Sequence, residues 1–205
     1  MRRMVAITVA TIVALLGLGT VGMVLAHSDD DPGWSHRMGW TSMPHARTTD
    51  EAGWLREMIA HHEEAVMAAG ELSRSEEPAM RAFGRTVVAD QSAQVVLMEG
   101  WLADWYPDEP DGTAYDPMMR DLSGLSGAAL DRAFLEDMIP HHMAAVMMSQ
   151  QLLVRGLAEH DEVADLATTI RTDQMREIRW MRARLADSSP DGARRAPCAW
   201  SRMGM

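Results

Sequence analysis

The chain has 205 residues, of which 47% are hydrophobic and 24% are charged, so it can bury an ordinary core and is not disordered by composition. Its formal net charge of −11 argues against a nucleic-acid partner, because phosphate binding needs clustered Lys and Arg side chains. The single cysteine, Cys198, excludes a framework of internal disulfides.

The N-terminus indicates export. Arg2 and Arg3 precede an uncharged apolar run over residues 4–26, which predicts that 1–26 is a signal peptide or an N-terminal membrane anchor. The run ends in small residues that suit signal peptidase, yet it is long enough to span a bilayer, so both readings stay open. In either case the rest of the chain is expected outside the cytoplasm, secreted or anchored to the outer face of the cytoplasmic membrane.

Residues 27–47 are polar and contain Pro and Gly, which predicts a flexible linker. Thr48 and Glu51 have the spacing of a capping box, so a helix is expected to begin there. Helical periodicity continues to about Ser73. A second helix is expected over 75–105, with a proline in its first turn.

The remainder is predicted to comprise a loop, an ambiguous stretch, two more helices and a disordered tail. In order, these segments are 106–116, 118–127, 128–155, 161–186 and 188–205. Pro140 lies inside the third helix, where it removes a backbone N–H and predicts a kink. The sequence does not indicate what the linker or the Cys198-bearing tail does.

The chain contains an internal repeat. Residues 54–62 match 134–142 in the same register, and the helices that follow also match. Repeat one spans 48–105 and repeat two spans 128–187, so each repeat is a helical hairpin. Because one hairpin cannot bury its apolar face alone, we predict an all-α four-helix bundle over 48–187.

Paired histidines fall on the apolar faces of the first and third predicted helices. A helix advances about 100° per residue, which places His61 and His62 inside the apolar sector on either side of Met58, and Glu64 on the opposite face. The third helix repeats this arrangement with His141, His142 and Met138. A buried imidazole needs a partner, so four in repeated register favour a metal site over plain packing.

Methionines complete the predicted metal site. The chain has 19 methionines, and Met98 and Met181 occupy matching core positions on the second and fourth helices, where plain packing is the alternative. Imidazole and thioether donors together favour copper, as Cu(I) or Cu(II), or silver. The predicted ligand set is His61, His62, Met58, His141, His142, Met138, Met98 and Met181. Glu57 and Asp137, one turn before the histidine pairs, are expected to orient the rings.

The segment Phe134 to His142, with its Met-Ile-Pro-His-His core followed by Ala145-Val146, resembles the exported bacterial family of the domain of unknown function DUF305. The resemblance covers about Asp50 to Ala186. It implies a ferritin-like four-helix bundle, a location outside the cytoplasm and, as in copper-binding members, a role in copper resistance. The residues carried over are His61, His62, Met58, His141, His142 and Met138. Ala60 departs from the proline of the motif.

The function that these patterns favour is a non-enzymatic protein that buffers or sequesters copper or silver, in metal resistance or homeostasis. One alternative is a redox bundle with non-covalent haem, ligated by His and Met. Another is an interaction module whose histidines serve packing or pH sensing. The Glu-x-x-His spacing of di-iron bundles is absent, and no nucleophile–base pair is evident. The sequence leaves open the oxidation state, the stoichiometry and whether the chain forms a homo-oligomer.

Overall fold

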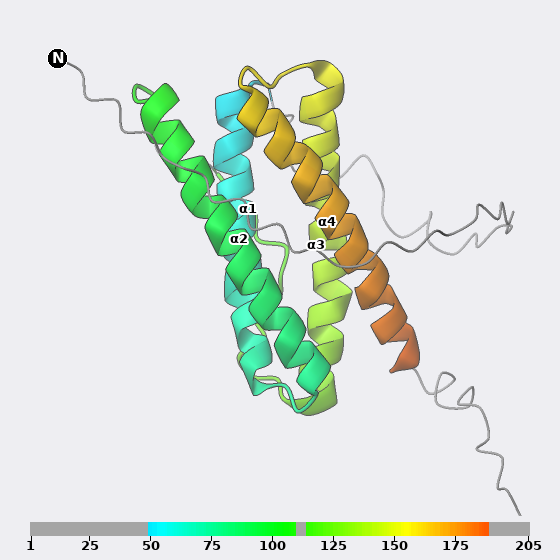
Figure 1. The fold of residues 1–205 in the computed structure, drawn as a ribbon. Helices are drawn as coiled ribbons and strands as arrows, with labels where there is room; N and C mark the ends of the chain where they lie inside the picture. The colour runs from blue at the N-terminus through cyan, green and yellow to red at the C-terminus, as the bar shows by residue number, and fades with distance from the viewer. Residues whose placement is uncertain (1–48, 110–113, 189–205) are drawn as a thin grey trace, which may run out of the picture. The chain divides into compact units, whose positions relative to one another are not determined.

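The computed structural model describes residues 49–109 and 114–188. These residues fold into four α-helices and one short 3-10 turn, and they contain no strand (Figure 1). The elements are α1 (Glu51–Glu71), η1 (Leu72–Arg74), α2 (Pro78–Trp105), α3 (Gly127–Arg155) and α4 (Asp161–Asp187). The predicted all-α fold of two helical hairpins is therefore confirmed. Its ferritin-like character stays a prediction.

Several predicted features fall outside the described residues. They are the signal peptide or anchor at 1–26, the linker at 27–47 and the tail beyond Ser188 with Cys198. Within the described part of the chain, no helix is both long enough and apolar enough to cross a membrane.

Local sequence sets the helix ends. Asp50 caps α1, because its carboxylate accepts a hydrogen bond from the backbone N–H of Gly53 at 2.7 Å. The predicted capping box was therefore wrong, and Glu51 has other partners. Pro78 begins α2, where its missing N–H costs nothing. Gly156 ends α3 with φ of 62°, a left-handed conformation that glycine adopts without strain.

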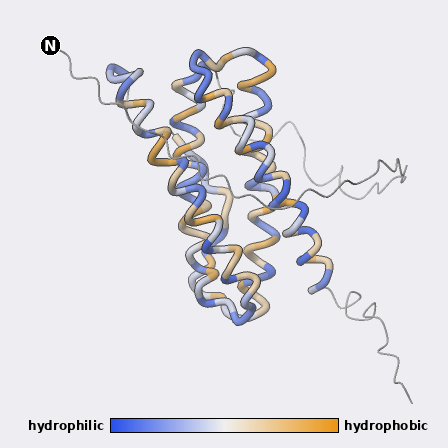
Figure 2. Tube along the Cα trace, in the orientation of Figure 1, coloured by the Kyte–Doolittle hydropathy of each residue, from blue (hydrophilic) through white to orange (hydrophobic). Residues whose placement is uncertain are grey.

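Within each hairpin the two helices pack side by side, α1 on α2 and α3 on α4, and α1 also packs on α3 across the hairpins (Figure 1). Apolar residues recur along all four helices, as the packing of amphipathic faces requires (Figure 2). The first hairpin is especially close at Gly84, where an added Cβ would lie 2.7 Å from the Ala69 carbonyl oxygen. The matching residue of the second hairpin is the buried Ala167.

The apolar core forms two clusters, and each draws on both hairpins. The Trp54 cluster includes Trp54, Met58, Met98, Leu152, Val163 and Ile170. The Phe134 cluster includes Ala65, Leu72, Met80, Phe134, Met138 and Met181. Neither hairpin therefore buries its apolar face without the other, which is the physical reason for the bundle.

The chain that enters α3 crosses α1 and α3 as an extended segment, residues 114–126, which we call the strap. Its Arg120 side chain donates to the carboxylate of Asp137 on α3 at 2.7 Å. Near its end, the carbonyl oxygens of Leu122 and Leu125 accept hydrogen bonds from Arg74 at 3.0 and 2.7 Å. Leu122 is buried in the Phe134 cluster, so the strap is part of the packed structure.

Candidate metal centre

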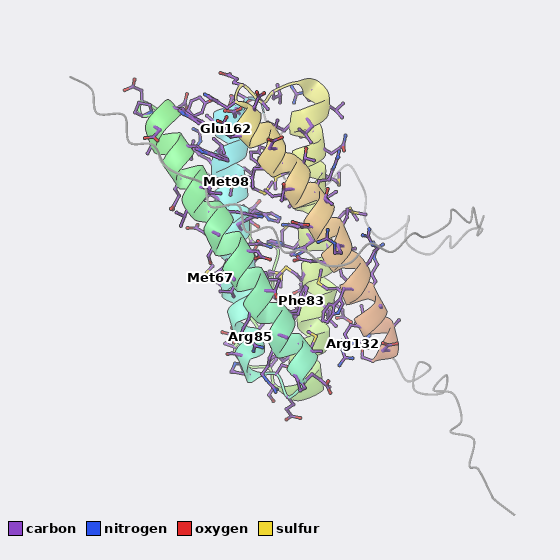
Figure 3. All side chains as sticks on the ribbon, in the orientation of Figure 1. Met67, Phe83, Arg85, Met98, Arg132 and Glu162 are labelled. Atoms are coloured by element: carbon purple, nitrogen blue, oxygen red, sulfur yellow. The ribbon has the colours of Figure 1, made fainter. Side chains whose placement is uncertain are left out.

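All four helices place buried polar side chains between the two apolar clusters. On α1 the histidines lie between Met58 of the Trp54 cluster and Ala65 of the Phe134 cluster. Figure 3 labels Met98, a member of the Trp54 cluster, and Phe83, which packs on the Phe134 cluster, with nitrogen-bearing side chains between their levels. We call this set the polar layer: His61, His62, Gln91, His141, His142 and Gln174.

The four imidazole rings form a row across the α1–α3 interface. His61 and His141 stack at its centre, with ring centroids 3.7 Å apart and ring planes tilted by 36°. His62 flanks His61, and His142 flanks His141, each at 6.2 Å between centroids. All four side chains have zero exposure to solvent. The prediction that both histidine pairs point into the core is therefore confirmed.

Oxygen acceptors hold the outer ring at each end of the row. Nε2 of His62 lies 2.8 Å from Oε1 of Gln94, and Nε2 of His142 lies 2.6 Å from Oε2 of Glu177. Because amide and carboxylate oxygens accept, each Nε2 donates and leaves the Nδ1 lone pair of a neutral ring open. Neither His62 Nδ1 nor His142 Nδ1 has a hydrogen-bond partner among the described residues.

The first of these rings is neutral at physiological pH. Burial lowers the pKa of His62 to about 3, and repulsion from His141 and His142 adds to that effect, while the hydrogen bond to Gln94 opposes it. A neutral imidazole is the form that binds a metal ion. The Nδ1 atom of His62 is therefore available as a metal ligand inside the bundle.

His141, one of the two inner rings, contacts the carboxylate of Glu64. The helical wheel had placed Glu64 on the face of the first helix opposite the histidines. Glu64 is only 7% exposed, and its Oε2 lies 3.1 Å from Nε2 of His141. The wheel failed here because the strap covers this side of α1. Burial alone would raise the pKa of Glu64, but hydrogen bonds from His141, Tyr115 and the Met119 N–H lower it to about 2. The carboxylate is therefore ionised.

Two glutamines in the layer were not predicted as site residues. Gln91 and Gln174 occupy matching positions in the two repeats and are 4% and 3% exposed. Neither side-chain amide has a hydrogen-bond partner among the described residues, which is costly for a buried group. The sequence signal that could have identified them is a glutamine at matching positions of the second and fourth helices, on faces that are otherwise apolar.

The four predicted methionine ligands are fully buried, but they are divided between the clusters. Met58 and Met98 belong to the Trp54 cluster, while Met138 and Met181 belong to the Phe134 cluster. The structure therefore buries two of these thioethers in each cluster, and their role as metal ligands stays a prediction. Among residues 49–109 and 114–188, no three His, Cys, Asp or Glu side chains lie together as a metal site would require.

The expected orienting role of Asp137 was also misplaced. Its carboxylate accepts hydrogen bonds from the backbone and side chain of Arg120 in the strap. Oxygen atoms that contact His62, His142 and His141 come from Gln94 and Glu177, on the helices packed alongside, and from Glu64. Spacing along one helix could not reveal these partners, because they depend on how the helices and the strap pack.

The sequence model of the domain of unknown function DUF305 matches residues 51–185, which is more than half of the chain. The chain belongs to the DUF305 family. Solved structures of similar proteins agree with this assignment. A DUF305 fragment from Deinococcus radiodurans is 31% identical with a TM-score of 0.59, and the match covers 68% of this chain and 97% of that one.

CopM in its Cu(II)-bound form is 27% identical with a TM-score of 0.60, and the match covers 67% of this chain and 97% of CopM. CopM also matches in Cu(I)-bound, silver-bound and apo forms. A DUF305 protein from Streptomyces coelicolor, described as secreted, is 27% identical with a TM-score of 0.57, covering 66% of this chain and 89% of that one. No protein of curated function matches.

Proposed function

We propose that this DUF305 protein binds copper or silver outside the cytoplasm and buffers or sequesters the metal, without enzymatic activity. The row of four buried imidazoles is the observation that carries the proposal. Its outer rings are held by oxygen acceptors at Nε2, and the Nδ1 atoms of His62 and His142 have no partner among the described residues. Lone pairs in this state suit a metal ion better than an apolar core.

The donor set fits a soft or borderline metal ion. Imidazole nitrogen suits copper, and the thioethers of Met58, Met98, Met138 and Met181 in the adjoining clusters suit Cu(I) and Ag(I). The likeness to CopM supports the same chemistry, because CopM carries copper or silver in several of its structures. Since His61 and His141 stack on each other, we expect some of the rings to rotate when metal binds.

A location outside the cytoplasm is supported by the sequence and by one relative. The apolar run at 4–26 after two arginines is typical of an export signal or an anchor. The similar protein from Streptomyces coelicolor is described as secreted. Metal binding in this location would serve resistance or homeostasis.

Titration of the purified protein tests metal binding directly. A ligand that binds the native state raises stability by about 2.7 kcal/mol at 100 times its dissociation constant, so Ag(I), Cu(I) and Cu(II) should raise the melting temperature. Mg(II), which prefers oxygen ligands, should leave it unchanged. If none of the three soft or borderline ions shifts the melting temperature, the proposal is wrong.

A further inference from the structure

One carboxylate connects the strap to the imidazole row. Oε1 of Glu64 accepts hydrogen bonds from the backbone N–H groups of Met118 and Met119, each at 2.8 Å. Its Oε2 accepts from the hydroxyl of Tyr115 at 2.5 Å and lies 3.1 Å from Nε2 of His141. Three of these four contacts come from the strap and one from the row.

The strap also covers the row on this side. The ring of Tyr115 meets His61 edge-on, with centroids 6.1 Å apart. His61 has zero exposure, and the inner pair His61 and His141 is closed off from solvent. A metal ion approaching the inner pair from the strap side therefore meets Tyr115 first.

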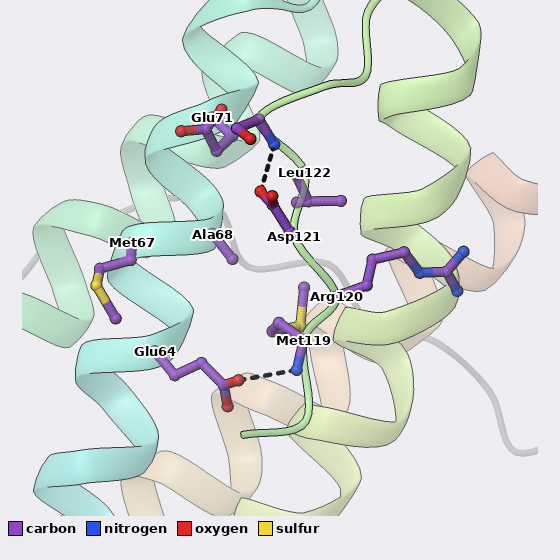
Figure 4. A pocket seen from close by; sticks show the side chains of 9 residues that line it. Glu64, Met67, Ala68, Glu71, Met119, Arg120, Asp121 and Leu122 are labelled. Atoms are coloured by element: carbon purple, nitrogen blue, oxygen red, sulfur yellow. Dashed lines mark hydrogen bonds between the residues drawn. The ribbon is translucent and has the colours of Figure 1, made fainter. Parts of the chain in front are cut away.

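The strap is not packed tightly against α1 along its whole length. A pocket of about 360 Å³ lies between them, with Glu64, Met67 and Glu71 on one side and Met119 to Ser123 on the other (Figure 4). This space gives the strap room to shift once its hydrogen bonds break. Its Arg120 and Arg74 contacts would still tether it to α3 and η1.

We propose that Glu64 is a positioning residue that couples the strap to the metal centre. The oxygens of Glu64 face two backbone N–H groups and the Tyr115 hydroxyl, so the carboxylate serves as the acceptor for His141 as well, keeps the proton of that ring on Nε2 and leaves Nδ1 as the metal-binding atom. The same carboxylate holds Tyr115 over His61, so metal reaches the inner pair when the Glu64–strap contacts break. The inference rests on the proposed metal binding. Ala144, the matching residue of the second repeat, offers no such carboxylate.

The test compares two matched tyrosine variants of the full chain. Tyr115→Phe removes one hydroxyl from Glu64, while Tyr106→Phe removes the equivalent hydroxyl from Glu51, 2.9 Å away at another place in the bundle. Uptake of Ag(I), followed by stopped-flow tryptophan fluorescence, should be roughly tenfold faster in Tyr115→Phe, since a hydrogen bond to a charged group is lost. Tyr106→Phe should match the wild-type rate. Equal rates in the two variants would overturn the coupling.

A second measurement needs no metal. The ¹⁵N shifts of the His141 ring report which nitrogen carries the proton, and a purely structural role for Glu64 would not alter them. We expect Nε2–H in the wild-type protein and a mixture of tautomers in Glu64→Gln. An unchanged ring in a folded Glu64→Gln protein would refute the positioning role. Because this readout uses metal-free protein, it also separates failure of the inference from failure of metal binding.

Discussion

The two hairpins contribute matching residues to the polar layer and differ in the residues that contact it. Both contribute a histidine pair and a buried glutamine at matching positions. The acceptor at the outer ring is the neutral amide of Gln94 in the first hairpin and the carboxylate of Glu177 in the second. At the inner ring, Glu64 in the first hairpin has Ala144 as its counterpart.

The difference teaches that the repeat preserves the donors while the charges around them have diverged. A carboxylate on Nε2 raises the basicity of an imidazole and compensates the charge of an incoming cation, whereas an amide only orients the ring. The His142 end of the row should therefore hold a metal ion more tightly than the His62 end. Each of the following predictions breaks or sharpens this contrast.

The largest effect is expected from removing both outer rings. The double variant His62→Ala/His142→Ala loses two of the predicted metal ligands. Its Ag(I) affinity should fall by more than roughly 100-fold, because loss of a residue that only orients a ligand already costs about 10- to 100-fold. Of the single variants, His142→Ala should lose more affinity than His62→Ala. Isothermal titration calorimetry measures all three. Wild-type affinity in the double variant would place the metal elsewhere.

Exchanging the acceptors should shift affinity between the two ends. Glu177→Gln is expected to weaken Ag(I) binding by about 10- to 100-fold, because an oriented carboxylate becomes a neutral amide. Gln94→Glu should strengthen it. Glu162→Gln makes the same charge change in an exposed side chain of α4 and serves as the control. If Glu162→Gln weakens binding as much as Glu177→Gln, long-range charge rather than ring contact is responsible.

Carboxylates near the starts of α1 and α3 offer a contrast in stability. Glu51 is fully buried and accepts from the His160 ring and backbone N–H and from Tyr106, whereas Oδ1 of Asp131, its counterpart, has no hydrogen-bond partner among the described residues. Glu51→Gln should reduce the free energy of unfolding by about 1.5–3 kcal/mol, and Asp131→Asn should change it little. Chemical denaturation measures both. Equal losses would contradict this assignment.

The hydrogen bonds of Glu51 also predict that part of the unfolding free energy is lost in acid. Burial alone would raise the pKa of Glu51, but hydrogen bonds from His160, Tyr106 and Glu159 lower it below its ordinary value of 4.5. A lowered folded-state pKa means that the stabilisation is complete above pH 4.5 and is lost as the pH falls below it. The unfolding free energy of Glu51→Gln should therefore decline less between pH 5 and pH 3 than that of the wild type. Parallel declines would rule this out.

The smallest predicted effect concerns helix spacing. In Gly84→Ala the new Cβ meets the Ala69 carbonyl oxygen of α1 and the Leu72 side chain of η1 within 3 Å, so the first hairpin should be destabilised by about 1–3 kcal/mol. At Ala167 the second hairpin already accommodates a methyl group. Ala167→Gly should cost about 0.5–1 kcal/mol through helix propensity alone. A Gly84→Ala protein as stable as the wild type would show that the hairpins share one spacing.

Much of this arrangement could be predicted from the sequence because it depends on short-range periodicity. The 3.6-residue repeat of apolar positions gave four helices, and the same wheel turned His61 and His142 inward. The matching of 54–62 with 134–142 required two hairpins to pair. The first two inferences need only the geometry of one helix, and the third needs only the repeat and the burial of an apolar face.

What could not be predicted depends on segments far apart in the sequence. Glu64 lies on the outer face of α1 by periodicity, and only the strap, more than 50 residues later, buries it. Gln94 and Glu177 reach the imidazoles from neighbouring helices, so no spacing within α1 or α3 reveals them. The division of the methionines between two clusters likewise follows from the packing of one hairpin against the other.

The polar layer across the otherwise apolar bundle also fixes how the two hairpins align along their length. If one hairpin slid along the other by a single helical turn, imidazoles of one chain segment would sit against Leu, Phe and Met of the other, where their nitrogens would have neither water nor oxygen atoms to meet. Apolar contacts alone would tolerate such a slip far better, because one aliphatic side chain replaces another at little cost. The same histidines that we assign to metal would thus also select a single register for the two halves of the molecule.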